Sequence, residues 1–516
     1  MFQNTYSALL SGISGIPLEI ECFIGGGLPY FSIVGIPAGQ AASARERIRS
    51  ALKSCGYPLP PSRVTINIRP VDPSQPLLAA AYEPLDLPIA LTILACQRHI
   101  PAAALSSSLF VGELGLSGAL RPVNGALSLG YAAKRIAANK LYLPQTNAAE
   151  ATFSAPCAVY PLHSLDQAIQ VLCRRQSLPA MPPAEPAKAL PPPSFLNAIR
   201  GQDIGKRSLM IAAAGWHNVL FIGPPGCGKT LLANSLPALL PPLSLEQQIQ
   251  ITEIYSACGL LPAGQSLITA RPFRSPHHSI SATALIGGGA SPRPGEITLA
   301  HQGVLFLDEL AEFSHAALES LRQPLEEHAI VLNRLKSSLR LPADFLLVAS
   351  MNPCPCGYYP DSARCHCTST RLRQYYEKIN TPLLDRIDLV VHLAPVKQQD
   401  LENSAPAISS AQAVRAVHRA HQAQLTRFRR RSALGAQYNA HMNTEQIQQF
   451  CILNESLRSF MHQAYDHYQL SMRSYYKVLK ISRTIADLEG SDAIQLPHLT
   501  EALQYRLTLP GLSATL

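Results

Sequence analysis

The chain has 516 residues, 47% of them hydrophobic and only 15% charged, which predicts about two to four domains with substantial cores. Its net charge of +9 favours an acidic partner such as nucleic acid, but weakly, because the excess is spread over a long chain. No apolar run reaches the ~20 residues of a membrane helix, and the first residues lack the pattern of a signal peptide. Of the 12 cysteines, eight are scattered singly, which argues against a secreted disulfide framework and favours reduced thiols in a cytoplasm.

Composition and periodicity divide the chain into segments. In the N-terminal part, short β-type runs such as residues 18–23 alternate with helical runs such as residues 41–52, which predicts a mixed α/β domain. A stretch rich in Pro and Ala follows, and then strand and helix patterns alternate as a parallel sheet with covering helices requires. The predicted segments are an α/β domain at 1–175, a linker at 176–194, an α/β nucleotide-binding core at 195–396, a basic helical insertion at 397–440 and a helical lid at 441–516.

A glycine-rich loop is the most informative motif. It follows an apolar run at residues 218–222 and precedes a helical pattern, and this context makes the match to GxxxxGK[ST] specific. Glycines let backbone N–H groups surround phosphate oxygens, Lys229 can reach the β- and γ-phosphates, and Thr230 can bind Mg²⁺. The predicted ligands of ATP and its Mg²⁺ in this loop are Gly223, Pro224, Pro225, Gly226, Cys227, Gly228, Lys229 and Thr230.

Two acidic residues follow a second apolar run about 80 residues later. Asp308 emerges at the end of the run, where a carboxylate can hold Mg²⁺ through water, and Glu309 can polarise the attacking water as a general base. The next apolar run ends in Asn352, whose side chain would face the γ-phosphate and the attacking water. Together with the phosphate loop, these residues predict an ATP hydrolase.

Two arginines complete the candidate catalytic set. Arg386 precedes an apolar run at residues 389–393, and it is either a surface charge at a helix end or an arginine finger that reaches the ATP of a neighbouring subunit. Arg473 opens a helix in the C-terminal part, from which it can sense the γ-phosphate. The order of these elements resembles that of an AAA+ ATPase, and a finger supplied to a neighbour implies a ring.

Longer motifs narrow this resemblance. They are residues 271–281, 285–289, 294–303 and 351–357 in the core, and 31–37, 44–49, 86–90 and 112–116 in the N-terminal part. These motifs are similar to those of the magnesium-chelatase-like AAA+ family, and the similarity covers nearly the whole chain. The resemblance implies a cytoplasmic homo-hexamer that moves on single-stranded or branched DNA without sequence preference and drives branch migration in natural transformation. The rival interpretation is an ATPase that remodels a protein partner and has no role on DNA.

The resemblance also gives the N-terminal domain the fold of the Lon-protease catalytic domain. Proteolysis there needs a serine nucleophile and a lysine base within hydrogen-bond reach. The segment expected to carry the serine, residues 81–88, has none, and the segment expected to carry the lysine, residues 124–129, has no lysine. Because Lys134 lies too far along the helix to replace it, we expect a domain without proteolytic activity that serves assembly.

Four cysteines cluster shortly after Asn352. Four thiolates in two close pairs suit tetrahedral Zn²⁺, which would brace the loop between Asn352 and Arg386. A disulfide pair and four free thiols are the alternatives, of which the disulfide is disfavoured in a cytoplasm. His366 offers a further possible ligand. The cysteines are Cys354, Cys356, Cys365 and Cys367.

Basic residues in two insertions are candidates for DNA contact. One insertion, at about residues 271–296, contributes Arg274, His277 and His278, and the other, a predicted hairpin at about residues 331–340, contributes Arg334 and Lys336 near its tip. Cations in such places would bind backbone phosphates and give salt-sensitive binding without sequence preference. For each residue, a solvated surface charge is an equally good interpretation. For the basic run at residues 427–431, a solvated face is favoured.

Overall fold

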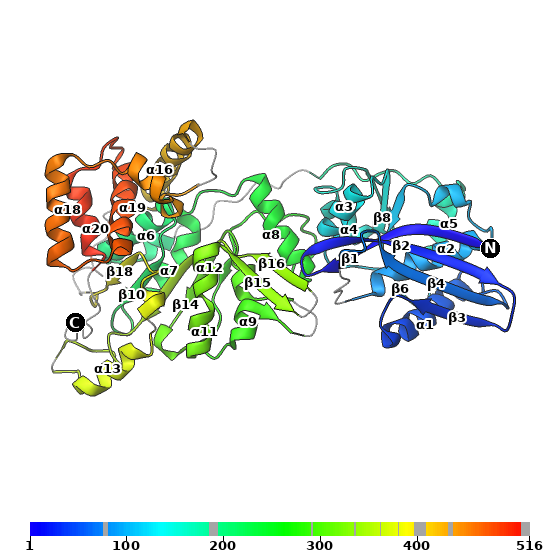
Figure 1. Cartoon of the computed structure of the whole chain (residues 1–516), viewed down its shortest axis with the longest axis horizontal. Helices are drawn as coiled ribbons and strands as arrows, with labels where there is room; N and C mark the ends of the chain where they lie inside the picture. The colour runs from blue at the N-terminus through cyan, green and yellow to red at the C-terminus, as the bar shows by residue number, and fades with distance from the viewer. Residues whose placement is uncertain are drawn as a thin grey trace.

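The structure is a computed structural model, and it describes residues 1–75, 81–184, 195–289, 293–334, 337–361, 363–379, 381–396, 409–431 and 437–506. Figure 1 shows an elongated molecule in which an N-terminal α/β domain lies beside the ATPase core, and the C-terminal helices cover the far end of that core. None of the helices in these ranges combines the length and apolar character needed to cross a lipid bilayer.

The N-terminal domain is built on a mixed sheet of seven strands. Neighbouring residues on a strand point to opposite faces, so Ala8 and Leu9 of β1 belong to two separate cores. In sheet order the strands are β3 (Tyr30–Val34), β4 (Arg63–Pro70), β2 (Ser14–Gly25), β1 (Phe2–Ser11), β5 (Ser108–Phe110), β8 (Lys140–Pro144) and β9 (Ala158–Leu162). A small hairpin is formed by β6 (Glu113–Leu114) and β7 (Leu120–Arg121).

Helices cover both faces of this sheet. The core around Leu9 is closed by α1 (Ala38–Ser54), α2 (Asp86–Cys96) and α5 (Leu165–Leu172), and the core around Ala8 by α3 (Ala126–Arg135) and α4 (Gln145–Ala151). Apart from Asp86 and Thr92, helix α2 is apolar around its circumference, as expected for a helix that is fully buried. The mixed α/β domain predicted from the sequence is therefore confirmed.

The ATPase core has a parallel sheet of five strands in the order β11 (Phe273–Arg274), β14 (Val304–Leu307), β17 (Leu346–Met351), β10 (Val219–Ile222) and β18 (Leu389–His392). Because all strands run in the same direction, their carboxyl ends meet at one edge and their amino ends at the other. Val219 and Phe221 face one core, and Leu220 and Ile222 face the other. The predicted parallel sheet is confirmed.

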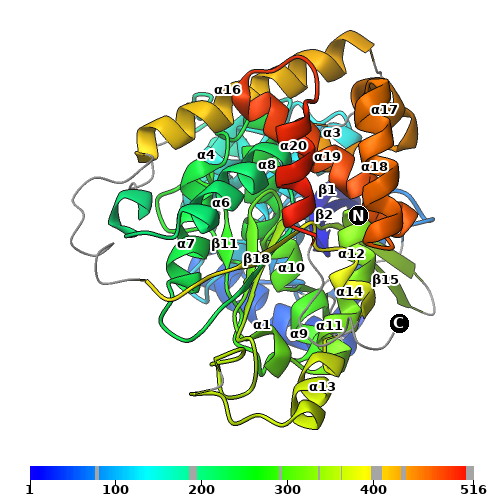
Figure 2. The same ribbon diagram turned by 90° about the vertical axis from the view of Figure 1, so that its left-hand side faces the viewer.

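The two faces of this sheet carry different helices. The core around Phe221 includes α6 (Asp203–Gly215), α7 (Lys229–Leu239), α16 (Ser410–Arg431), α17 (Thr444–Phe450), α18 (Glu455–His467), α19 (Met472–Glu489) and α20 (Leu496–Gln504). The other face carries α9 (Ala282–Ile286), α10 (Glu296–Leu299), α11 (His315–Ser320), α12 (Arg322–Glu327), α13 (Ser369–Glu377) and α14 (Thr381–Leu384). The helix in the predicted basic insertion, α16, lies against α6 and α19, as Figure 2 also shows, and buries Ala413, Val417 and Ala420.

The two domains meet along α8 (Leu245–Ala257), which packs against α3. The backbone N–H of Gly125 donates to the Ser256 hydroxyl over 3.0 Å, and the Ser128 hydroxyl donates to the Glu253 carboxylate over 3.2 Å. A hairpin of β15 (Ala329–Arg334) and β16 (Ser337–Pro342) also approaches the N-terminal domain, where Leu339 lies against Gly12. Ser128 lies in the segment expected to carry the protease lysine, and it is thus engaged in contact between domains.

Candidate active site

The phosphate loop connects β10 to α7. Gly226 and Gly228 have φ angles of 77° and 95°, a conformation that favours glycine, and a Cβ on either residue would meet nothing within 4 Å. The glycines are therefore required by the backbone, and the space above them is open to a ligand. The Lys229 ammonium donates to the carbonyls of Gly223 and Pro224, over 2.6 and 3.0 Å, and to Asn352 Oδ1 over 3.1 Å.

These contacts hold Lys229 folded back over the loop. Burial lowers the pKa of Lys229, against the opposing attraction of Cys227, Asp308 and Glu309. A phosphate oxygen entering the loop would replace the neutral carbonyl partners of Lys229 and pair the ammonium with a negative charge. Asn352 is itself held in place, because the Tyr375 hydroxyl of α13 donates to its carbonyl over 3.1 Å.

The predicted magnesium ligands lie together at the carboxyl edge of the sheet. The Thr230 hydroxyl donates to Asp308 Oδ2 over 3.2 Å, so one divalent cation could contact both side chains. The Ser350 hydroxyl donates to the other oxygen, Asp308 Oδ1. Sequence analysis missed Ser350, although a buried serine within the apolar strand β17 is a signal that could have drawn attention to it.

The general-base candidate Glu309 projects from a strained backbone. Its φ is 54°, an unusual value for a residue with a side chain, and such strain concentrates at functional sites. The side chain is 55% exposed, and its Oε2 lies 3.3 Å from Nδ1 of His278. His278 was expected to contact DNA, whereas the structure places it beside the residue that would activate water.

The other members of the DNA-binding prediction have mixed surroundings. Arg274 forms a two-point ion pair with Glu296, over 2.6 and 2.8 Å, so its charge is neutralised within the insertion. The ring of His277 lies beside that of His278, with centroids 4.0 Å apart and a tilt of 35°, and its Nδ1 lies 2.8 Å from the Ser279 hydroxyl. The backbone of Arg334 ends strand β15, while its side chain and all of Lys336 lie outside the described residues.

The two candidate arginines lie at the opposite edge of the sheet from the phosphate loop. Strands β10 and β18 are parallel, with Val219 opposite Leu389 and Ile222 opposite His392. The loop follows Ile222 at the carboxyl end, whereas Arg386 precedes Leu389 at the amino end.

Both arginines bind the same carboxylate. Nη2 of Arg386 lies 2.6 Å from Oε1 of Glu326, and Arg473 pairs with that same oxygen. Arg473 first and then Arg386 hold the pKa of Glu326 below its usual range. No sequence motif marked Glu326. Packing of α12 at the amino edge of the sheet brings it to the arginines.

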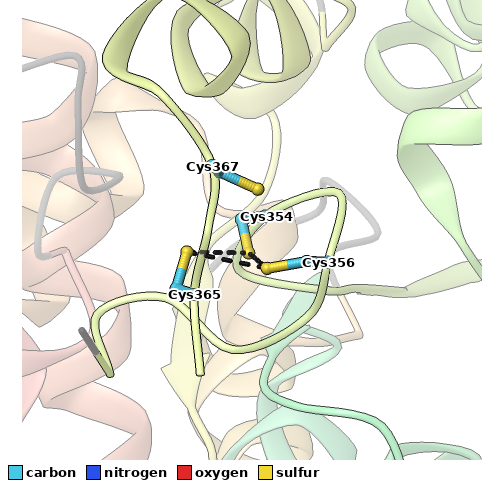
Figure 3. Close-up of side chains that lie close together, drawn as sticks. All are labelled: Cys354, Cys356, Cys365 and Cys367. Atoms are coloured by element: carbon cyan, nitrogen blue, oxygen red, sulfur yellow. Dashed lines mark hydrogen bonds between the residues drawn. The ribbon is translucent and has the colours of Figure 1, made fainter. Parts of the chain in front are cut away.

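The four clustered cysteines converge, as Figure 3 shows. The sulfur of Cys354 lies 3.2 Å from that of Cys356 and 3.8 Å from that of Cys365, and the Cys356 and Cys365 sulfurs are 3.6 Å apart. Together with Cys367, the sulfurs lie within 4.8 Å of one another. Four sulfurs around tetrahedral Zn²⁺, with bonds of about 2.3 Å, would be about 3.8 Å apart.

The backbone around the cluster favours thiolates. The N–H groups of Gly357 and Tyr359 donate to the Cys354 sulfur over 3.2 and 3.4 Å. A backbone N–H at Tyr358, followed by the contact with Cys354, lowers the pKa of Cys356 to about 6. The residues present therefore fit a zinc ion in number and spacing. If the four cysteines were unrelated free thiols, backbone N–H groups aligned on the Cys354 sulfur would not be expected.

The basic run on α16 contains a half-buried charge. Arg427 pairs with Asp487 of α19 and donates to Asn439 Oδ1 over 3.2 Å. Asp487 also binds Arg483, whose Nη2 is 2.9 Å away. Arg427 therefore anchors α16 to α19.

Comparisons with known proteins identify the family of the chain. The family model described as "Magnesium chelatase, subunit ChlI" matches residues 195–401, "Magnesium chelatase, subunit ChlI C-terminal" matches 407–506, and "Subunit ChlI of Mg-chelatase" matches 20–147. "Uncharacterized protein YifB" of Salmonella typhimurium is 39% identical over 505 residues, which are 98% of this chain and 96% of that protein.

Two further relatives differ in how much of this chain they match. "Competence protein ComM" of Haemophilus influenzae is 37% identical over 511 residues, 97% of this chain and 96% of that protein. "Magnesium-chelatase 67 kDa subunit" of Chlorobaculum parvum is 25% identical over 202 residues, only 38% of this chain and 26% of that protein. The chain therefore belongs to the magnesium-chelatase-like family of AAA+ ATPases that includes ComM and YifB.

Proposed function

We propose that this chain assembles into a hexameric ring that couples ATP hydrolysis to movement on DNA, and that it acts as a branch-migration helicase in natural transformation. The observation that carries the proposal is the division of the candidate catalytic residues between the two edges of one sheet. Strand β10 has four residues, from Val219 to Ile222. At about 3.3 Å per residue, such a strand separates the edges by about 13 Å.

That separation is too large for a γ-phosphate bound by Lys229 to contact Arg386 of the same subunit. A ring solves the problem, because the amino edge of one subunit can face the phosphate loop of the next. On this proposal, Lys229, Thr230, Asp308, Glu309 and Asn352 come from one subunit. Arg386 comes from its neighbour, where it stabilises the charge that develops on the γ-phosphate.

Arg473 lies beside Arg386, and we assign it to the same neighbouring ATP. Glu326 holds both guanidinium groups in the isolated subunit. An incoming γ-phosphate would compete with Glu326 for them, since it offers more charge and more acceptor oxygens than one carboxylate.

The role on DNA rests on the relatives and on the basic hairpin. The similarity to competence protein ComM of Haemophilus influenzae extends over nearly the entire chain, which supports a role in DNA uptake or its later processing. Because Arg274 is neutralised by Glu296, we assign phosphate contact first to Arg334 and Lys336. His277 and His278 would then connect the insertion to Glu309.

ATPase measurements with and without forked DNA test the proposal. DNA should stimulate hydrolysis, and Glu309→Gln should retain ATP and DNA while abolishing strand movement. The double change of Arg334 and Lys336 to Ala should weaken DNA binding and flatten its dependence on salt, whereas Lys134→Ala, on the exposed face of α3, should not. Hydrolysis that is indifferent to DNA, with no DNA retained at low salt, would refute the assignment.

The partial similarity to a magnesium-chelatase subunit favours the rival function, an ATPase that remodels a protein partner. That function predicts stimulation by a protein partner and none by DNA. Capture of a chelatase-type subunit by the Glu309→Gln variant, in the presence of ATP, would support it.

We also propose that the four cysteines hold a structural Zn²⁺. The ion would fix the segment between Asn352, which faces the ATP, and α13, whose Tyr375 holds Asn352. Zinc here would supply rigidity and no chemistry.

A further inference from the structure

A second group of metal-ligand side chains lies far along the chain from the cysteines. His328 ends α12, Asp344 precedes β17, and His441 lies in the short helix Asn439–His441 beside α19. The ligand atoms of the three side chains lie within 4.8 Å of one another. Three separate parts of the fold thus bring two imidazoles and one carboxylate to a single point.

The distances approach those around a bound ion. Asp344 Oδ1 lies 3.3 Å from Nδ1 of His328 and 3.6 Å from Nε2 of His441. Around a tetrahedral ion with bonds of about 2.0–2.1 Å, adjacent donor atoms are about 3.4 Å apart. Two of the three separations therefore match without rearrangement, and the two histidines need only a small approach.

The atoms that face the centre lack other partners. Within the described ranges, neither Asp344 Oδ1 nor His441 Nε2 has a partner in hydrogen-bonding geometry, although both atoms are buried. Buried polar atoms are normally satisfied, so this pair calls for an explanation. A cation between them satisfies both at once, together with His328.

Neighbouring residues fix the orientation of Asp344. Gln302 Nε2 donates to Asp344 Oδ2 over 3.1 Å, and the N–H of Asp344 donates to Nδ1 of His301 over 3.1 Å. The backbone N–H of Gln302 donates to the Asp344 carbonyl over 2.6 Å. One carboxylate oxygen is thus occupied, and the other is aimed at the histidines. Such support of a ligand is typical of built metal sites.

We propose that His328, Asp344 and His441 form a binding site for a divalent transition metal, with Zn²⁺ as the first candidate. Two imidazoles and one carboxylate are ligands that Zn²⁺ accepts, and a water can occupy the remaining position. His328 and His441 also line a cavity of about 440 Å³, which gives an entry path for the ion and its water. The metal would tie the base of the β15–β16 hairpin to the C-terminal helices.

Metal counting on the full-length protein tests this site apart from the cysteines. In a variant with Cys354, Cys356, Cys365 and Cys367 changed to Ser, one equivalent of Zn²⁺ should remain after dialysis. Adding His441→Gln should weaken its binding by at least about 100-fold, and adding His462→Gln, which changes an exposed histidine on α18, should not.

Spectroscopy on the protein with its cysteines intact gives a second readout. With Co²⁺ as the probe, this site should give weak visible bands without thiolate charge transfer, and Asp344→Asn should remove those bands alone. Circular dichroism must show that the variants are folded. If the folded Cys→Ser protein binds no Zn²⁺, or if the bound Zn²⁺ is insensitive to His441→Gln and Asp344→Asn, the three side chains form an ion-pair cluster and the proposal is wrong.

Discussion

Mixtures of inactive variants test whether Arg386 serves a neighbouring subunit. Lys229→Ala removes the phosphate-loop lysine but leaves both arginines, and Arg386→Ala does the reverse. Each variant alone should lose about 10³-fold or more of the hydrolysis rate, the scale set by arginine fingers. In an equimolar mixture, random assembly places an intact loop against an intact arginine at about one interface in four, so about a quarter of the wild-type rate should return.

Mixtures that contain Arg473→Ala test whether both arginines come from the same donor subunit. Because Arg473 and Arg386 share Glu326, they should come from the same donor subunit. Lys229→Ala mixed with Arg473→Ala should therefore recover the same fraction of activity. Arg386→Ala mixed with Arg473→Ala should recover none, since every donor then lacks one arginine.

The opposite results would refute this reasoning. If Arg473 contacted the ATP of its own subunit, the first mixture would stay inactive and the mixture of the two arginine variants would recover activity. The assay is steady-state phosphate release under conditions of subunit exchange, with mixed assemblies verified by native mass spectrometry. No recovery in any mixture, despite mixed assemblies, would reject the shared site altogether.

Three further predictions follow from contacts outside the loop. His278→Ala should lower the single-turnover rate by up to about 100-fold with ATP affinity unchanged, because it releases the general base, while His278→Gln should retain most activity; equal loss in both would contradict this. Cys356→Ser, or a chelator acting on the wild type, should lower the melting temperature if zinc is bound, and the chelator should have no further effect on the variant. Lys477→Met should reduce the free energy of unfolding by about 3 kcal/mol because it strands buried Asp388, as urea denaturation can measure. Although burial opposes it, Lys477 and then His217 hold the pKa of Asp388 far below its usual range. The difference in unfolding free energy between the wild type and Lys477→Met should therefore be full at neutral pH and shrink as the pH falls below about 4. A difference that stays constant with pH would contradict this prediction.

The sequence patterns that point to one half of the candidate site have a physical basis. Asp308 and Asn352 follow apolar runs, and in a parallel sheet the residues after such runs must meet at the carboxyl edge. Lys229 and Thr230 could be assigned from the loop motif alone, because its functional residues are consecutive in the sequence. The fold class was predicted from alternating strand and helix patterns and the family from longer motifs, and both are confirmed.

The other half depends on packing that no local pattern encodes. Arg274 was a candidate for DNA contact because its partner, Glu296, is distant in the sequence. The two residues meet only when the insertion is folded. His278 reaches Glu309 for the same reason. Glu326 belongs to no motif, and its importance emerges only when α12 and the C-terminal helix α19 are placed beside each other.

The position of Glu326 links the shared site to the hairpin. Glu326 lies near the end of α12, and two residues later His328 begins the turn into β15, so α12 and the hairpin form one continuous segment. On the proposed function, transfer of Arg386 and Arg473 from Glu326 to a neighbour's phosphate removes two ion pairs from the base of that segment. The hairpin is then freer to shift in the ATP-bound state than after phosphate release. A metal held by His328 and His441 would oppose that shift, so the two proposals together predict that Zn²⁺ at this site slows DNA-stimulated hydrolysis without weakening ATP binding.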